Sequence, residues 1–162
     1  MKNLVKSCSK SRISRMIAVV MLLSFVRVGS AWAGYGTDVA EKIARYAAIM
    51  EDVQEMTITK INSALLTKSS NSMSYTAKLY SGNKYVVYAF GDARISDTDL
   101  TVYRKSSSGE WLQVKKDADT SNLAIVSFDC NTTGDYKFEI KAYEFEEGYS
   151  QGYYGLIIGF DN

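Results

Sequence analysis

The chain has 162 residues, of which 46% are hydrophobic and 23% are charged, with 19 Lys and Arg against 18 Asp and Glu. The length supports one modest domain, or one domain with an appendage, and the composition is typical of a globular chain rather than a disordered one. The absence of histidine excludes Ser-His and Cys-His catalysis and histidine-ligated metal sites, and two cysteines are too few for a disulfide framework or a four-thiolate zinc site.

The first 33 residues have the pattern of a secretory signal peptide. Five basic residues and no acidic ones precede the apolar stretch 16–26, and Ala31-Trp32-Ala33 then forms a small-x-small cleavage site. The apolar stretch would form a helix of about 16 Å, too short for a hydrocarbon core of about 30 Å. A buried core helix or a membrane anchor is the alternative. We expect export to the periplasm or the medium and a mature protein that does not span a membrane.

Removal of residues 1–33 would change the charge of the protein. It would leave 129 residues with 13 basic and 18 acidic side chains, a net charge of −5. Nucleic acid is therefore not an expected partner, because phosphate neutralisation needs clustered Lys and Arg. One cysteine, Cys130, would remain at the end of an apolar segment, which predicts that it is buried, with a free thiol or an intermolecular disulfide as the alternatives.

The segment 34–70 is predicted to contain a helix and a linker. Apolar residues recur at helical spacing from Asp38 to about Leu66, with Asp38 as the expected N-cap. β-Branched residues near Thr57 weaken the pattern, so one long helix or two in series is expected. Residues 67–71 form a polar linker. The helix is expected to pack on the domain that follows, with docking to a partner or to a second copy as the alternative.

Residues 71–162 are predicted to form an antiparallel β-sandwich with a jelly-roll-like arrangement. Short segments rich in Val, Ile, Tyr, Phe and Thr alternate with turn signals, and no helical segment separates them. From Tyr136 to Ala142 the even-numbered residues are apolar and are expected to face the core. The seven expected strands are 75–80, 84–90, 99–104, 110–115, 123–128, 135–143 and 153–160.

The segment from about residue 79 to residue 160 carries a series of short motifs in a defined order. They are Ser81-Gly82-Asn83-Lys84-Tyr85, Asp97-Thr98-Asp99-Leu100-Thr101-Val102-Tyr103, Asp117-Ala118-Asp119, Gly134-Asp135-Tyr136-Lys137-Phe138-Glu139-Ile140 and Gly152-Tyr153-Tyr154-Gly155-Leu156-Ile157-Ile158. Together these motifs resemble the bacterial pre-peptidase C-terminal domain. The resemblance implies a small β-sandwich module of the kind usually appended to secreted peptidases, and some members of that family bind calcium. In this sequence, a helix and not a peptidase is expected before the module.

Two aspartate pairs are candidate metal ligands. Asp97 and Asp99 are two residues apart at a strand entry, and Asp117 and Asp119 repeat this spacing in the next turn. Two such pairs on neighbouring loops could supply half of the oxygen ligands that Ca²⁺ requires, which makes Ca²⁺ the candidate cofactor. The alternative is that these aspartates begin turns and keep strand edges soluble.

Four aromatic residues are candidates for a ligand-contact surface. Strand alternation points Tyr103 and Tyr143 away from the core, Trp111 lies on the next expected strand, and Tyr149 lies in an acidic loop. Exposed aromatic side chains suit binding to sugars or proteins because they bury a large area with little loss of rotamer freedom. A second sheet face covered by the N-terminal helix is the alternative explanation for these aromatic residues.

The expected function is therefore non-catalytic binding of a protein or a polysaccharide. The glutamates at 144, 146 and 147 share a solvated loop, which lacks the burial that separates the pKa values of an acid and a base. The alternative is an accessory subunit, inhibitor or chaperone-like partner of a secreted enzyme that docks through the N-terminal helix.

Overall fold

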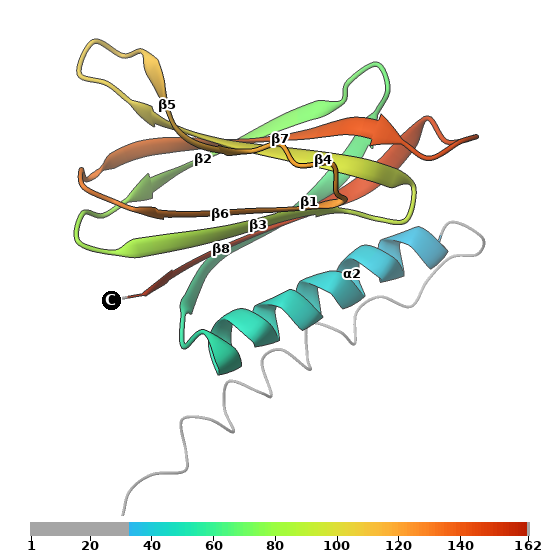
Figure 1. Ribbon diagram of the computed structural model, residues 1–162, viewed down its shortest axis with the longest axis horizontal. Helices are drawn as coiled ribbons and strands as arrows, with labels where there is room; N and C mark the ends of the chain where they lie inside the picture. Colours follow the sequence, from blue (N-terminus) through green and yellow to red (C-terminus); the bar gives the residue numbers. More distant parts are fainter. Residues whose placement is uncertain (1–32, 162) are drawn as a thin grey trace, which may run out of the picture. The chain divides into compact units, whose positions relative to one another are not determined.

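The protein is a β-sandwich of two four-stranded antiparallel sheets preceded by a helix, as a computed structural model of residues 33–161 describes it (Figure 1). Sheet A has the strand order β1-β8-β3-β6, and sheet B has the order β2-β7-β4-β5. The elements are α2 (Ala33–Ala48), the π-helical turn η1 (Ile49–Val53), β1 (Thr57–Thr67), β2 (Ser72–Leu79), β3 (Lys84–Gly91), β4 (Ile95–Lys105), β5 (Trp111–Asp117), β6 (Leu123–Asp129), β7 (Gly134–Phe145) and β8 (Gln151–Asp161). The predicted antiparallel sandwich is confirmed.

The predicted signal peptide, residues 1–33, lies outside the described residues except for Ala33, which begins α2. Within the described part of the chain, no helix has both the length and the apolar character needed to cross a membrane.

The helix predicted from Asp38 to about Leu66 is correct only in its first half. It begins earlier, at Ala33, so that Asp38 lies inside the helix and is not its N-cap. The helical backbone ends at Val53, and residues 57–67 form β1 at the edge of sheet A. The expected linker 67–71 instead joins β1 to β2, which belongs to the other sheet.

A β-bulge explains why β1 has the apolar spacing of a helix. The pairing of β1 with β8 shifts between Ile58 and Lys60, so Ile58 and Ile61 lie opposite Gly159 and Ile157, on the same side of the sheet. Leu65 lies on that side as well, four residues later. The spacing of three and then four residues therefore arises from a bulged strand.

The main core lies between the two sheets, and the predicted alternation of β7 is confirmed. Tyr136, Phe138, Ile140 and Ala142 are buried there, and the lysines and the glutamate between them are partly exposed. Cys130 is buried as predicted and is a free thiol that contacts the Tyr136 hydroxyl. Burial and this contact raise the pKa of Tyr136 above its ordinary range.

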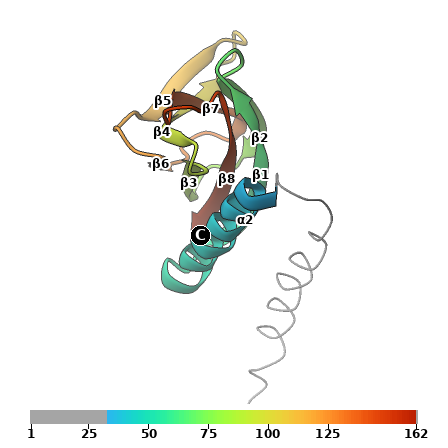
Figure 2. The ribbon, with the colours of Figure 1, turned by 90° about the vertical axis from the view of Figure 1, so that its right-hand side faces the viewer.

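A second core lies between α2 and the outer face of sheet A (Figure 2). Val39 and Met50 are buried there against Tyr88, Phe90 and Ile157 of the sheet. The expectation that the amphipathic helix packs on its own sandwich is confirmed. Since the apolar side of the helix is already covered, that side is not free to dock onto a secreted enzyme.

Candidate functional site

The outer face of sheet B is the broad sheet surface that no described helix covers. In Figure 2, α2 lies beside sheet A, on the side away from β4, β5 and β7. Along β7 the residues facing outward are Lys137, Glu139 and Lys141, which lie opposite Tyr103, Thr101 and Asp99 of β4. The two sheets therefore have different roles, because sheet A carries the helix and sheet B presents side chains to solvent.

Two of the predicted aromatic residues meet on this face through one lysine. The Lys137 ammonium lies 4.3 Å from the centroid of the Tyr103 ring and 5.5 Å from that of the Trp111 ring. The Lys105 ammonium lies 5.8 Å from the Trp111 ring. We call these four residues the aromatic ridge. Both rings are half-buried, so each keeps part of its surface in contact with solvent.

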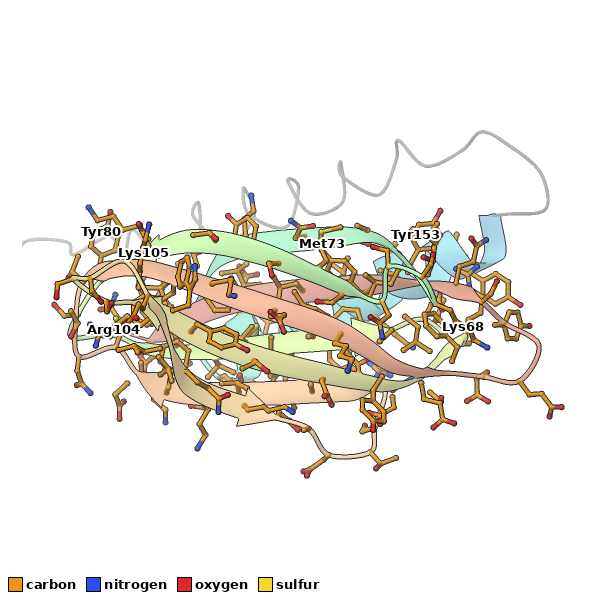
Figure 3. The ribbon with its side chains drawn as sticks, turned by 90° about the horizontal axis from the view of Figure 1, so that it is seen from above. Lys68, Met73, Tyr80, Arg104, Lys105 and Tyr153 are labelled. Carbon is orange, nitrogen blue, oxygen red and sulfur yellow. The ribbon has the colours of Figure 1, made fainter. Side chains whose placement is uncertain are left out.

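The strand register assembles the aromatic ridge. Tyr103 lies opposite Lys137 on β7 and opposite Gln113 on β5, and Trp111 lies opposite Lys105. Trp111 is therefore a diagonal neighbour of Tyr103, within reach of long side chains. A register shift between Val102 and Tyr103 sets this pairing. Figure 3 shows Arg104 and Lys105 of β4 toward one end of the sandwich, with Lys68 toward the other.

Tyr143 and Tyr149, the other two predicted contact residues, lie away from the aromatic ridge. Tyr143 is 63% exposed, and its ring lies 4.9 Å from the Lys141 ammonium. It follows Lys137 by six residues on β7, a separation of roughly 20 Å along an extended strand. Tyr149 is hydrogen-bonded to Tyr35 of α2 at 2.8 Å. The four aromatic residues thus do not form one surface.

Asp117 and Asp119 do not form a pair of free carboxylates. The Asp117 carboxylate accepts hydrogen bonds from the backbone N–H groups of Asp119, at 3.1 Å, and Ile125, at 2.7 Å. Asp119 itself is exposed. This arrangement is that of an aspartate that stabilises a turn, which was the alternative explanation for the pair.

Asp97 and Asp99 are both buried in β4, and each is engaged by protein groups. Asp97 accepts a hydrogen bond from the Ser121 N–H at 3.4 Å, and Asp99 forms an ion pair with Lys116 at 3.6 Å. Burial raises the pKa of Asp97, with smaller contributions from the negative charges of Asp99 and Glu144, while the Ser121 bond opposes the rise. Among residues 33–161, no group of three or more acidic or cysteine side chains is placed to hold a metal. The structure therefore does not gather the four aspartates into the Ca²⁺ site expected from the sequence.

Sequence reasoning missed the lysines of the aromatic ridge. Alternation along β7 places Lys137 on the outer face, and this signal was available in the sequence. The proximity of Lys137 to Tyr103 depends on the pairing of β7 with β4, which are far apart in the sequence. Its proximity to Trp111 depends also on the pairing of β4 with β5, whose register is shifted.

Comparisons with known proteins find structural similarities and no sequence family. No family model matches the sequence, and a search of curated proteins yields no match. The fold is similar to the pre-peptidase C-terminal domain of collagenase from Bacillus anthracis, with a TM-score of 0.48 and 14% identity over 62% of this chain and 89% of that chain. It is also similar to PliG, a periplasmic inhibitor of g-type lysozyme from Aeromonas hydrophila, with a TM-score of 0.46 and 13% identity over 63% of this chain and 85% of that chain. A structure described as CBM4 has a TM-score of 0.40 and 10% identity over 69% of this chain and 83% of that chain. The chain has structural similarity to a pre-peptidase C-terminal domain, and its assignment as a β-sandwich comes from its own two sheets.

Proposed function

We propose that this protein is an exported, non-catalytic binding module that holds a polysaccharide on the outer face of sheet B. The observation that carries the proposal is the aromatic ridge, in which Tyr103 and Trp111 flank the Lys137 ammonium at 4.3 and 5.5 Å. Aromatic rings offer flat apolar area for the apolar faces of sugar rings, and the ammonium donates hydrogen bonds to sugar oxygens.

The position of the aromatic ridge on regular strands supports a binding role. Tyr103 and Lys137 are held by two neighbouring strands of sheet B, whose inward-facing residues Val102 and Phe138 are fully buried. A surface fixed in this way loses little conformational freedom when it binds a ligand. An extended polysaccharide suits a broad sheet face better than it suits a closed pocket.

The placement of three glutamates supports a non-catalytic role. Glu144 lies near the end of β7 and is not in the expected loop, whereas Glu146 and Glu147 follow the strand, and all three side chains are exposed. A catalytic acid and base need environments that differ in burial. Export remains part of the proposal and depends on the signal-peptide pattern of residues 1–33.

Affinity electrophoresis through gels that contain a panel of neutral and acidic polysaccharides tests the binding role. The wild-type protein should be retarded by at least one of them, and Trp111→Ala and Tyr103→Ala should each weaken the retardation about tenfold. Tyr143→Ala is the matched control, because it removes an exposed tyrosine beside a lysine on the same face. Absence of retardation by every polysaccharide, or equal losses in all three variants, would overturn the proposal. If the same surface captured a protein instead of a polysaccharide, the polysaccharide proposal would be overturned. The ligand would then be a protein, which is the other class expected from the sequence.

Cell fractionation tests the export. Expressed in a bacterial host, the full chain should be recovered outside the cytoplasm with Gly34 as its first residue. Recovery of the uncut chain in the cytosol would contradict export.

A further inference from the structure

We infer that the polysaccharide bound on sheet B is acidic, a chain whose sugars carry carboxylates. This inference rests on the proposed function and adds the chemical class of the ligand. It is carried by the charges that the sheet register gathers around the aromatic ridge.

The outer face of sheet B has more basic than acidic side chains along its regularly paired part. The lysines on this face are Lys78, Lys105, Lys116, Lys137 and Lys141. The acidic residues on it are Asp99, Asp135 and Glu139. Residues 34–162 as a whole carry 13 basic and 18 acidic side chains, so the regularly paired part of this face has the opposite sign to the protein as a whole. A local positive field on an acidic protein attracts anionic ligands to that face and repels them elsewhere.

Not all of these lysines are neutralised by their neighbours. Lys116 pairs with Asp99 at 3.6 Å, and Lys137 lies 3.7 Å from Glu139. Within residues 33–161, Lys78, Lys105 and Lys141 have no ion-pair partner. Lys105 is one of the four residues of the aromatic ridge, so an unneutralised cation lies beside the Trp111 ring.

The charge of the face changes from basic at one end to acidic at the other. Asp97 and Glu144 lie opposite each other between the two register shifts of β4, at the far end of the strand from Lys105. The like charges of Asp99 and Glu144 both act on Asp97, so that end of the face is acidic. An anionic chain would therefore be drawn to the aromatic ridge and away from Asp97.

The contacts of Lys137 suggest how a sugar carboxylate would bind. In the free protein its ammonium lies over the rings of Tyr103 and Trp111 and 3.7 Å from the Glu139 carboxylate, which is beyond direct hydrogen-bond distance. A ligand carboxylate in direct contact with this ammonium would form a charge-assisted hydrogen bond, which is stronger than the ring contacts that it would replace. The ring faces would then be free to contact the sugar ring.

Matched pairs of polysaccharides test the inference, because esterification removes the charge and keeps the sugar backbone. We would compare polygalacturonate with its methyl ester, and alginate with its propylene glycol ester, by affinity electrophoresis and by calorimetry. At least one acidic form should bind ten or more times more tightly than its ester, and its affinity should fall as salt rises. The double variant K105Q/K137Q should lose at least fivefold in affinity for the acidic form. The matched control K84Q, which removes an exposed lysine from sheet A, should change it by less than twofold.

The outcomes separate this inference from the proposed function. Equal binding of an acidic polysaccharide and its ester would overturn the acidic class and leave polysaccharide binding intact. Absence of binding to every neutral and acidic polysaccharide would overturn both. Binding of a thymidine oligonucleotide as tightly as of polygalacturonate or alginate would also overturn the inference, because the face would then recognise polyanions in general.

Discussion

The guanidinium group of Arg94 donates two hydrogen bonds to the carboxylate of Asp92, and both side chains are buried. The same carboxylate accepts the backbone N–H groups of Arg94 and Tyr153, each at 2.9 Å. The ring of Tyr35 from α2 lies 4.2 Å from the guanidinium carbon of Arg94. This ion pair therefore joins the β3–β4 loop, the start of β8 and the helix.

Replacement of Asp92 by Asn should lower the free energy of unfolding by about 3–5 kcal/mol, because the substitution leaves the buried charge of Arg94 without a counter-charge. Urea denaturation measures the change. The control Asp129→Asn removes an exposed carboxylate at the end of β6 and should change stability by less than about 0.5 kcal/mol. The double variant D92N/R94Q should be less destabilised than the sum of the two single variants. A loss below about 1 kcal/mol for Asp92→Asn would contradict a structural role for the pair.

The helix should contribute to stability through a few buried residues. Met50 is fully buried against sheet A, and Val53, in the same π-helical turn, is 74% exposed. Met50→Ala should therefore cost about 2–5 kcal/mol, and Val53→Ala less than about 0.5 kcal/mol. Thermal and urea unfolding of the two variants would check this. Equal and small effects would mean that the helical segment does not depend on contacts of η1 with sheet A for its position.

Close packing should make Gly155 of β8 intolerant of a side chain. A Cβ atom at this position would lie 2.5 Å from two ring atoms of Phe90, which is itself buried beneath α2. Gly155→Ala should destabilise the fold by about 1–3 kcal/mol because the ring has to move. Gly134, at the start of β7, has open space around it, so Gly134→Ala should be neutral or stabilising. Similar unfolding midpoints for both variants would contradict the packing of Phe90 on β8.

The raised pKa of Asp97 predicts how stability depends on pH. Its carboxylate is less stable in the folded chain than in the unfolded one, where the ordinary value is 3.8, so ionisation of this group lowers stability near neutral pH. As pH falls through the raised pKa, the folded state takes up the proton first, and this destabilisation disappears. Asp97→Asn should therefore be more stable than wild type at pH 7, with a difference that shrinks as pH falls toward 3.8.

Thermal unfolding of the Asp97→Asn variant at several pH values provides the measurement. Asn keeps a side-chain oxygen to accept the Ser121 N–H, so the change isolates the charge. A variant less stable than wild type at pH 7 would show that the charge of Asp97 is favourable in the fold.

Local patterns predicted most of the strands. All seven expected strands overlap with β2–β8, because residues that favour strands are grouped in short segments and turn residues separate them. The burial of Cys130 followed from its place at the end of such a segment. The missing strand, β1, has a bulge between Ile58 and Lys60 that gives it a helical spacing, and only its pairing with β8 distinguishes the two structures.

The sequence by itself therefore determined the sandwich class, the strands β2–β8 and the presence of outward-facing aromatic residues. The tertiary structure decided which of those residues meet: Tyr103 joins Trp111 through Lys137, Tyr143 lies further along β7, and the aspartates serve turns and ion pairs. The physical reason is that the face of the sheet to which a side chain points follows from local alternation along the strand, whereas the residues that it contacts depend on strand order and register. The packing of the whole domain sets strand order and register.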